Sequence, residues 1–497
     1  MFLMVTPKKA RERLVTHPIS RSPGKYLRRI ALVFLALGIC FALVACDAAR
    51  TQAKQQGGKR VDYFTDNGLG NAVAVVQHPA GEHHGGVTYV SYQGPLEDPY
   101  VASYSHETGQ WMGPFKAGVS DMGKDPDRPR KIDNHGKPTL IIDAEGYIHV
   151  FFGGHGGMPV HGENPLGNHH YGRNKHVVSK NPLDITSWEE LDTIPAFGTY
   201  NQAVKMDNGD IYLFYRHGAH RSDWVYQKSI DNGRSFTPPV SFLKHKRRKD
   251  LAAVDSWYAW VSKGNGDDII VSFDYHLCWD GDAGRNGMGH TTERRDVYYM
   301  VFNTRDETWR NVQGELLDTP IQREHAENMT LVATTGDDWT FNGSAHLDSL
   351  GNPHIGINIG AHQGLHFGGP KQTSHFRWTG AEWVGGRPGS MPVARGDFEL
   401  TESGDVRFLL AYEEEGGDGV VAWWNSSNGG RDFSKGKELL RRENAGFATS
   451  SLIRNAHPDA RVIVAEKRPG SDFRKMFLLG DRGPVRRAES EARVLDR

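Results

Sequence analysis

Three cysteines are few for a chain of 497 residues, and their positions exclude a disulfide framework. Cys40 and Cys46 lie at the end of an N-terminal apolar run, so Cys278 is the one thiol in the rest of the chain. Small exported domains without a large core are usually held together by several disulfides. This chain must instead be stabilised by a large hydrophobic core, which roughly 430 residues can bury.

The chain also lacks an excess of either charge and a long helical period. It carries 59 basic and 60 acidic residues, which gives a formal net charge of −1. That balance leaves no overall electrostatic footprint for nucleic acid, so we expect no nucleic-acid partner, and any polyanion must bind at a local site. The 58 glycines and 24 prolines, spread in short clusters, indicate a globular protein with many turns.

The N-terminus is typical of a targeting segment. Basic residues at 25–29 precede the apolar run 30–45, which leads into Leu-Val-Ala-Cys at Cys46, a sequence similar to a bacterial lipobox. A membrane-spanning anchor is the alternative, but sixteen residues are short for one. We therefore predict a lipoprotein-type signal peptide over 1–46 and a polar tether over 47–60. The protein is then exported, and either anchored to a bacterial membrane, at the cell surface or in the periplasm, or secreted.

A turn followed by an apolar or aromatic strand recurs along the chain. Glycines at 86, 146, 209, 266, 351 and 404 mark six copies, and HPDARVIVAE (457–466) is a seventh copy without glycine. Most copies are about sixty residues apart, and no long helical period interrupts them. Seven copies predict an all-β protein, a seven-bladed β-propeller over residues 61–480. The charged segment 481–497 is expected to be a solvated or loosely helical tail.

Two short motifs support the same fold. SIDNGRSF (229–236) fits the S-x-D-x-G-x-x-F/W turn that is called an Asp-box, and SSNGGRDF (426–433) is a degenerate copy. These turns close hairpins in propellers of the sialidase type. Their polar side chains satisfy the backbone of the turn, so we interpret both motifs as structural.

One interval between repeats is longer than the others and contains HLCWDGDAGRNGMGH, residues 276–290. His276 and Cys278, with His290 twelve residues later, offer nitrogen and sulfur ligands that suit Zn²⁺. A bound zinc would also explain an isolated reduced thiol in an exported protein. No C-x₂-C pair is present, and a buried thiol with two surface histidines is the alternative. His220 is a candidate fourth ligand, and the acidic DGD turn in the same stretch would suit a calcium ion.

The hairpin PTLIIDAEGYIHVFFGGHGG, residues 138–157, has a histidine near each end. Its turn centres on residues 143–146, so His135 and His155 return to the same end of one blade, where propellers bind ligands. Taken alone, the two imidazoles are candidates for metal ligands, core residues or catalysts.

Three residues downstream extend this candidate site. Each has an ordinary structural explanation, because a tyrosine near a strand is usually a core edge and an arginine at a strand end usually faces solvent. Together they suggest a carboxylate-binding, proton-transferring site with aromatic platforms: Tyr200, Arg216 and Tyr258. Trp257, beside Tyr258, either stacks on a sugar ring or packs against the next blade.

The run DNHGKP…GYIHVFFGGHG, with Tyr200, Arg216 and Tyr258 downstream, resembles the BNR-repeat ulvan lyases of polysaccharide lyase family 25, which are related to family 24. The resemblance covers residues 61–480 and extends to the HLCW…GH loop. It implies a monomeric enzyme whose substrate is ulvan, a chain of rhamnose 3-sulfate joined to glucuronate or iduronate. It also implies endo-type β-elimination, which cleaves the C4–O bond and leaves 4,5-unsaturated uronyl oligosaccharides.

The residue types fit that chemistry. Arg216 offers a two-pronged cation for the uronate carboxylate and for the charge that develops on it. We favour His135 as the base and Tyr200 as the acid, because an imidazole titrates near neutral pH, and a phenol beside a guanidinium either ionises more easily or donates strongly. The opposite assignment stays open, because the C5 proton points to opposite faces in glucuronate and iduronate. His155 and Tyr258 are expected to bind the carboxylate or to orient the catalytic pair.

Three other functions share parts of this pattern. A sialidase-like glycoside hydrolase has the same propeller and Asp-boxes but needs three clustered arginines and an acidic catalyst. A non-catalytic glycan-binding propeller would bind ulvan without shortening it. A lyase for another uronate polymer would differ only in its substrate.

Overall fold

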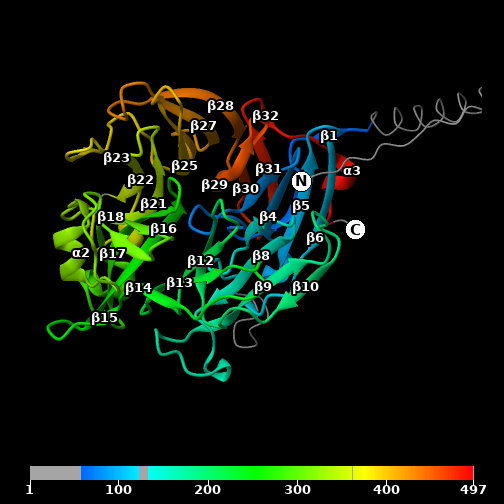
Figure 1. The fold of residues 1–497 in the computed structure, drawn as a ribbon. Helices are drawn as coiled ribbons and strands as arrows, with labels where there is room; N and C mark the ends of the chain where they lie inside the picture. The colour runs from blue at the N-terminus through cyan, green and yellow to red at the C-terminus, as the bar shows by residue number, and fades with distance from the viewer. Residues whose placement is uncertain (1–57, 123–131, 361, 496–497) are drawn as a thin grey trace, which may run out of the picture. The chain divides into compact units, whose positions relative to one another are not determined.

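The computed structural model describes residues 58–122, 132–360 and 362–495 (Figure 1). Arg60–Arg497 form one compact unit, to which the description below applies. The predicted signal peptide and nearly all of the predicted tether lie outside the described residues. Within the described ranges, no helix is both long and apolar enough to cross a membrane.

The unit is built from antiparallel sheets, which confirms the all-β class. In each set of strands the first pairs with the second and the second with the third, in chain order. The first strands are β3 (Gly81–His84), β7 (Thr139–Ile142), β11 (Thr199–Lys205), β16 (Ala253–Lys263), β21 (Thr340–Leu347), β25 (Ala394–Leu400) and β29 (Gly446–His457). They contact one another in a closed ring, from β3 through β7, β11, β16, β21, β25 and β29 back to β3. A ring of first strands is the arrangement expected of a propeller, and seven blades remain the prediction from the repeat.

Each sequence repeat folds as the turn after a first strand and the second strand that follows it. The second strands are β4 (Val87–Gln93), β8 (Ile148–His155), β12 (Ile211–Arg216), β17 (Asp268–Trp279), β22 (Pro353–Gly360), β26 (Val406–Glu413) and β30 (Ala460–Lys467). The third strands are β5 (Pro99–Ser105), β9 (Tyr171–Ser179), β13 (Trp224–Ser229), β18 (Arg294–Asn303), β23 (Lys371–Trp378), β27 (Gly419–Ser426) and β31 (Phe473–Gly480). The repeats therefore predicted strands correctly in every sheet where they occur.

The outer strands differ more than the inner ones. They are β6 (Gln110–Lys116), β10 (Trp188–Leu191), β14 (Val240–Leu243), β19 (Thr308–Arg310), β24 (Trp383–Gly386), β28 (Ser434–Arg442) and β2 (Thr65–Leu69). Short additions extend the sheet of β16 and that of β31: β15 (Lys246–Arg247), β20 (Leu331–Ala333) and β32 (Gly483–Pro484). The short helix α2 (Arg323–Met329) precedes β20.

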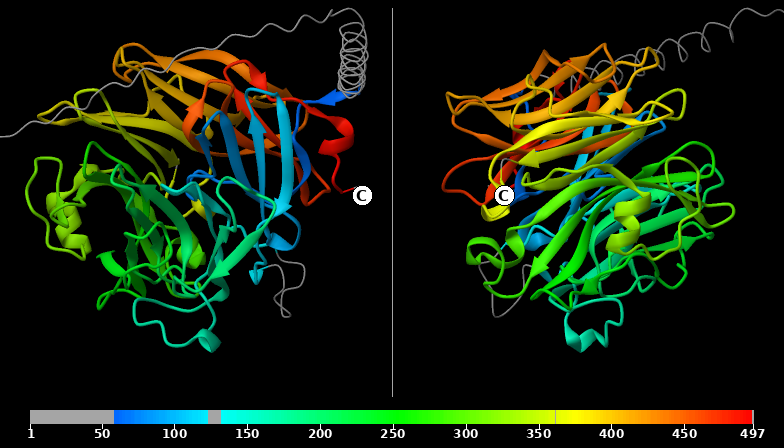
Figure 2. Two further views of the ribbon diagram at one scale, coloured as in Figure 1. Left: turned by 45° about the vertical axis from the view of Figure 1, so that its right-hand side comes forward. Right: turned by 90° about the vertical axis from the view of Figure 1, so that its left-hand side faces the viewer.

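The two ends of this unit are joined in one nine-stranded sheet. β2 pairs with β31, so an N-terminal strand completes the C-terminal group of strands. A single parallel pair, Arg454 with Glu82, then joins β29 to β3. Figures 1 and 2 show the blue N-terminal strands beside the red C-terminal ones. Contacts between residues far apart in sequence therefore close the ring.

The predicted tail is more ordered than the sequence suggests. β33 (Arg487–Ala488) pairs with β1 (Arg60–Val61), and the short helix α3 (Glu489–Ala492) follows it. Arg487 and Ala492 are buried, and Ala492 belongs to a core cluster with aromatic residues of the last sheets. The tail was expected to be solvated or loosely helical; a short helix does form, but Arg487 and Ala492 pack against the fold, which the few apolar positions of this stretch did not indicate.

The turns that the sequence identified are stabilised by their own side chains. In the first Asp-box the Asp231 carboxylate accepts hydrogen bonds from the backbone and the hydroxyl of Ser235, and Ser229 accepts the N–H of Gly233. In the degenerate copy Asn428 replaces the aspartate and accepts a hydrogen bond from Ser426. The structural interpretation of both motifs is confirmed.

Candidate active site

His135 and His155 lie face to face at one end of the β7–β8 hairpin. Their ring centroids are 3.7 Å apart, and their planes differ by 11°. One carboxylate holds both rings: Nδ1 of His135 lies 2.5 Å from Oδ1 of Asp133, and Nδ1 of His155 lies 2.8 Å from Oδ2. The hydroxyl of Tyr171 donates to the same carboxylate. Because an ionised carboxylate only accepts hydrogen bonds, each Nδ1 carries the proton and each Nε2 keeps its lone pair.

Tyr200 reaches His135 from a distorted part of β11. The pairing of β11 with β12 is broken by a bulge between Thr199 and Gln202, and the φ of Tyr200 is +63°. A residue other than glycine in this region costs about 1–3 kcal/mol, and bulges commonly redirect a side chain. The ring of Tyr200 lies 5.4 Å from that of His135 and is nearly parallel to that of Trp224. The bulge thus places the phenol beside the imidazole.

Arg216 ends β12, and its buried guanidinium packs against two neighbouring tyrosine rings, whose centroids are 5.7 Å apart. Its Cζ atom lies 5.0 Å from the ring centroid of Tyr200 and 5.1 Å from that of Tyr258. The side chain is fully buried, and none of its three nitrogens has a hydrogen-bond partner among the described residues. The buried hydroxyl of Tyr258 also has no hydrogen-bond partner among the described residues. A buried cation without a partner is costly, so these groups favour an anionic ligand.

Arg294, the first residue of β18, is a site residue that sequence reasoning missed. Its Cζ atom lies 3.6 Å from the ring centroid of Tyr258 and 4.7 Å from that of Trp339. The side chain is buried, and its Nε and Nη1 atoms have no hydrogen-bond partner within the described ranges. It follows His290 by four residues, in the long interval where the sequence suggested metal ligands alone. Asp133 was missed too, although it precedes His135 by only two residues.

Burial and hydrogen bonds fix the protonation of these groups. Burial favours a higher pKa for Asp133, but the hydrogen bonds from His135 and His155 hold that pKa well below its usual range. Burial lowers the pKa of His135, against the opposing effect of Asp133. Burial and the neighbouring His135 lower the pKa of His155 to about 4. Both imidazoles are therefore neutral near pH 7, beside an ionised carboxylate.

Tyr200 is a protonated phenol in the free site. Burial and Tyr258 raise its pKa above the usual range, and Arg216 offsets only part of that rise. The guanidinium favours ionisation of the phenol, as the sequence suggested, but burial and Tyr258 outweigh its effect in the free site. Because the phenol keeps its proton, the geometry favours the other expected role, in which Tyr200 donates a proton.

Trp257 belongs to the core. It is fully buried, its indole N–H donates to the backbone carbonyl of Lys244, and its ring contacts Phe273 and Tyr275 edge-on. Of the two readings offered by the sequence, packing inside the fold is the correct one.

The predicted zinc ligands lie next to this site. The ring of His220 is 4.5 Å from that of His290 and 5.7 Å from that of His276. Nε2 of His276 donates to the carbonyl oxygen of His290 at 2.8 Å, so its buried Nδ1 carries a lone pair, for which the described residues offer no donor. Cys278 is buried on the same strand, and burial raises the pKa of its thiol. These donors fit a zinc ion: three neutral imidazoles, one with its tautomer fixed by a carbonyl, and one thiol.

The ligand atoms of these four residues are not gathered as closely as those of two other groups. Within the described residues, His135, His155 and His220 form one group whose ligand atoms all lie within 4.8 Å of one another, and His106, His457 and Asp459 form the other. His220 thus lies between the imidazole pair and the predicted zinc ligands.

The DGD turn, which the sequence offers for calcium, has an aspartate that is already paired with arginines. The carboxylate of Asp280 contacts the guanidinium groups of both Arg221 and Arg247. Since both of its oxygens already accept hydrogen bonds from cations, a calcium ion there would have to displace them.

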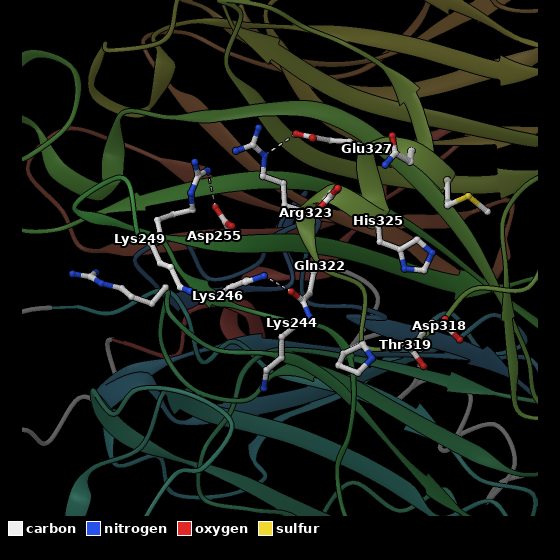
Figure 3. Close-up of a pocket in the computed structure, with 16 residues that line it drawn as sticks. Lys244, Lys246, Lys249, Asp255, Asp318, Thr319, Gln322, Arg323, His325 and Glu327 are labelled. Carbon is white, nitrogen blue, oxygen red and sulfur yellow. Dashed lines mark hydrogen bonds and ion pairs between the residues drawn. The ribbon is translucent and has the colours of Figure 1, made fainter.

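A cavity of about 1200 Å³ lies elsewhere, between the region of β15 and helix α2 (Figure 3). Basic side chains dominate its lining, but most of them have partners. Arg323 pairs with Glu327, Lys246 donates to Gln322, and Lys244 contacts Asp223. None of the site residues predicted from the sequence lines this cavity.

Known proteins resemble this chain over most of its length. Residues 165–385 match the BNR repeat-containing family. An ulvan lyase of Nonlabens ulvanivorans is 56% identical over 464 residues, which cover 93% of this chain and 98% of that protein. An ulvan lyase named as PL25, from Pseudoalteromonas sp. (strain PLSV), is 60% identical over 433 residues, 86% of this chain and 88% of that protein.

The fold is similar to a solved structure as well. A PL25 ulvan lyase bound to -[GlcA(1-4)Rha3S]- has a TM-score of 0.84 and 59% identity, and the match covers 87% of this chain and 99% of that one. The similarity therefore extends over most of the sheets, including strands that carry residues of the candidate site.

Proposed function

We propose that this chain, which belongs to the ulvan lyases of polysaccharide lyase family 25, cleaves ulvan by endo-type β-elimination. The reaction breaks the C4–O bond of a glucuronate or iduronate unit and leaves a 4,5-unsaturated uronyl end. One observation carries the proposal: the buried guanidinium of Arg216, which has no hydrogen-bond partner among the described residues, packs against the rings of Tyr200 and Tyr258.

Arg216 makes the C5 proton of the uronate removable. An ionised carboxylate disfavours a carbanion on the adjacent carbon, so its charge must be neutralised before the proton leaves. A guanidinium binds a carboxylate through two parallel hydrogen bonds, and burial strengthens the charge it contributes. The Tyr258 hydroxyl, beside Arg216, is placed to donate to the same carboxylate as negative charge moves onto it.

His135 is suited to take the C5 proton. The Nδ1–H of His135 donates to Asp133, so Nε2 carries the lone pair that can accept the C5 proton. The ring does not have to change tautomer before it acts. As the proton arrives, the carboxylate stabilises the imidazolium that forms, in the way that a buried aspartate supports other catalytic histidines. His155 shares the same carboxylate and stacks on His135, which fixes the orientation of the base.

Tyr200 is suited to protonate the departing O4. Its raised pKa keeps the proton on the phenol until the leaving oxygen becomes basic. The strained backbone of Tyr200 holds the ring close to both His135 and Arg216. Base, acid and carboxylate clamp are thus neighbours. Arg294, which also packs against the ring of Tyr258, offers a second cation for an anionic group of the same sugar chain.

The test is to incubate the purified protein with ulvan and to follow the ultraviolet absorbance of the conjugated uronate, with product masses measured in parallel. We expect absorbance to rise while the chain shortens. Shortening with products heavier by one water and no absorbance would identify a hydrolase, and binding without shortening would identify a glycan-binding propeller. A panel of other uronate polymers tests the substrate.

A structural zinc ion, held by His220, His276, Cys278 and His290, is part of the same proposal. The donor types, the neutral imidazoles and the lone pair on Nδ1 of His276 support it. Zinc bound there would fix the long loop between β17 and β18, which delivers Arg294. Metal analysis of the purified protein should find the ion, and the Cys278→Ser variant should lose it. Equal zinc content in both proteins would contradict the assignment.

The remaining parts of the proposal concern the cell. We propose a monomeric, exported lipoprotein with its lipid on Cys46, supported by the lipobox-like sequence alone. Partition into detergent should distinguish the full chain from its Cys46→Ser variant, and light scattering should give the mass of one chain. Identical partition of both proteins would contradict lipidation.

A further inference from the structure

A second histidine cluster lies where the last sheet meets the first. His83 belongs to β3, His106 follows β5 directly, and His457 ends β29. Asp459 lies in the turn between β29 and β30. The nearby parallel pair joins β29 to β3, so residues from both ends of the described chain meet in this cluster.

We propose that His106, His457 and Asp459 bind a divalent transition-metal ion, such as Zn²⁺, that fastens the C-terminal strands to the N-terminal ones. Their ligand atoms all lie within 4.8 Å of one another. The rings of His106 and His457 are 3.9 Å apart, and the ring of His83 lies 5.1 Å from the former and 5.3 Å from the latter. Two imidazoles and a carboxylate are a common zinc-binding set, and they leave a position for water.

A hydroxyl group orients the His106 ring. Oγ1 of Thr88 lies 2.8 Å from Nε2 of His106 and 3.0 Å from Nδ1 of His83. A hydroxyl has one proton, so it accepts from one ring and donates to the other. When Nε2–H of His106 donates to Thr88, Nδ1 of His106 keeps its lone pair for a metal. Partners of this kind fix the tautomer in metal sites.

His457 and Asp459 each have a contact that a metal would replace. Nδ1 of His457 accepts the backbone N–H of Asp459 at 3.1 Å and lies 4.0 Å from Oδ2 of the same aspartate, so a metal at this nitrogen takes the place of that hydrogen bond. The exposed side chain of Arg482 donates to both oxygens of Asp459 and holds the carboxylate ionised. A dication brought to this point replaces the contact with Arg482 at the cost of one exposed ion pair, which is worth little.

The site would stabilise the closure of the ring. His106 and His457 come from opposite ends of the described chain, so a metal between them restrains a very long loop of the unfolded chain. Zinc should therefore raise the unfolding temperature of the full chain after treatment with a chelator. This expectation does not depend on the reaction that the enzyme performs.

Equilibrium dialysis against Zn²⁺, with metal counted per protein, tests the proposal on four full-length proteins: wild type, His457→Ala, Thr88→Val and Cys278→Ser. We expect His457→Ala to hold one zinc fewer than wild type, and Thr88→Val to bind that ion about 10- to 100-fold more weakly, as is usual for partners that orient a ligand. Cys278→Ser must keep this ion, which separates it from the zinc proposed near β17.

The control is His84→Ala, which removes a neighbouring half-buried histidine on β3 that belongs to neither group. It should bind zinc as wild type does, and zinc should raise its unfolding temperature equally. Equal zinc content and an equal zinc-induced rise in His457→Ala and His84→Ala would overturn the proposal. Matching unfolding curves of the metal-free variants show that both are folded.

Discussion

Two basic regions of this protein differ in how their charges are satisfied. At the active site, Arg216 and Arg294 are buried, and the described residues leave most of their guanidinium nitrogens without a hydrogen bond. In the cavity of Figure 3 the cations are more exposed and mostly paired, as in the 2.7 Å contact between Arg323 and Glu327. The cavity is the more conspicuous feature, yet its charges already have partners.

The difference separates binding from structure. A buried cation without a partner costs several kcal/mol, so a fold keeps one where a ligand repays that cost. An exposed ion pair contributes about 0–1 kcal/mol and is common on any protein surface. The unsatisfied guanidinium groups, rather than the volume of the cavity, are therefore the basis for the proposed sugar-binding site.

The largest effect is expected from His135→Ala, with His325→Ala in the cavity as its control. Loss of the base should reduce kcat by about 10²- to 10⁴-fold, because proton transfer by a placed side chain contributes that much. His325 lines the cavity and contacts none of the proposed catalytic groups, so its variant should retain the wild-type rate. Initial rates of unsaturated uronate formation are compared for the two variants. A similar loss of activity in both would contradict a catalytic role specific to His135.

Next in size is Arg216→Lys, matched by Arg323→Lys. Both changes keep a positive charge, but a lysine cannot reproduce the two parallel hydrogen bonds of a guanidinium. We expect kcat/KM to fall about 10²- to 10³-fold for Arg216→Lys, since removal of one preorganised donor has that effect. Arg323→Lys should change it less than twofold. Equal retention of activity would show that Arg216 does not clamp the carboxylate.

Arg294→Gln should have a smaller effect, mostly on KM. Hydrogen bonds to charged groups contribute about 1.5–3 kcal/mol, which corresponds to roughly a 10- to 100-fold change. Because Arg294 packs against the ring of Tyr258 and, within the described ranges, against that of neither His135 nor Tyr200, its loss should weaken binding of the sugar chain more than proton transfer. Steady-state kinetics separate the two parameters, and an effect confined to kcat would assign Arg294 to the chemical step instead.

The smallest effect concerns stability against pH. The pKa of His155 is about 4 in the folded protein and near 6.5 when unfolded, so the unfolded state binds the extra proton between these values. Its contribution to stability is complete above pH 6.5 and is lost as the pH falls towards 4, at about 1.4 kcal/mol per pH unit. Urea unfolding at several pH values should give a shallower acid slope for His155→Gln. An unchanged slope would show that His155 is not held neutral.

The sequence was most informative where the chain is locally regular. The hairpin turn at 143–146 forms as predicted, with the Asp143 carboxylate accepting the N–H groups of Glu145 and Tyr147, and it delivers His135 and His155 to one place. Tyr200 and Arg216 were found because both belong to one pair of strands, β11 and β12. Spacing along a repeat predicts contacts of this kind.

The rest depends on contacts that spacing does not encode. Arg294 reaches Tyr258 from a different strand, and Asp133 acquires its meaning only when two histidines and Tyr171 converge on its carboxylate. The burial that keeps the proton on Tyr200 is likewise a property of the assembled sheets. The charge and chemical type of each side chain follow from the sequence. The balance between burial and neighbouring charge, which determines the pKa of each group, does not.

The elimination mechanism is tested most directly by Tyr200→Phe, which removes one oxygen from the site and leaves its packing. Unsaturated uronate should be measured by its ultraviolet absorbance during a single turnover on ulvan, with substrate binding measured separately. The account predicts near-normal binding and a rate reduced by about 10²- to 10⁴-fold, because the leaving O4 then lacks its acid. A wild-type rate of unsaturated product in Tyr200→Phe would contradict it.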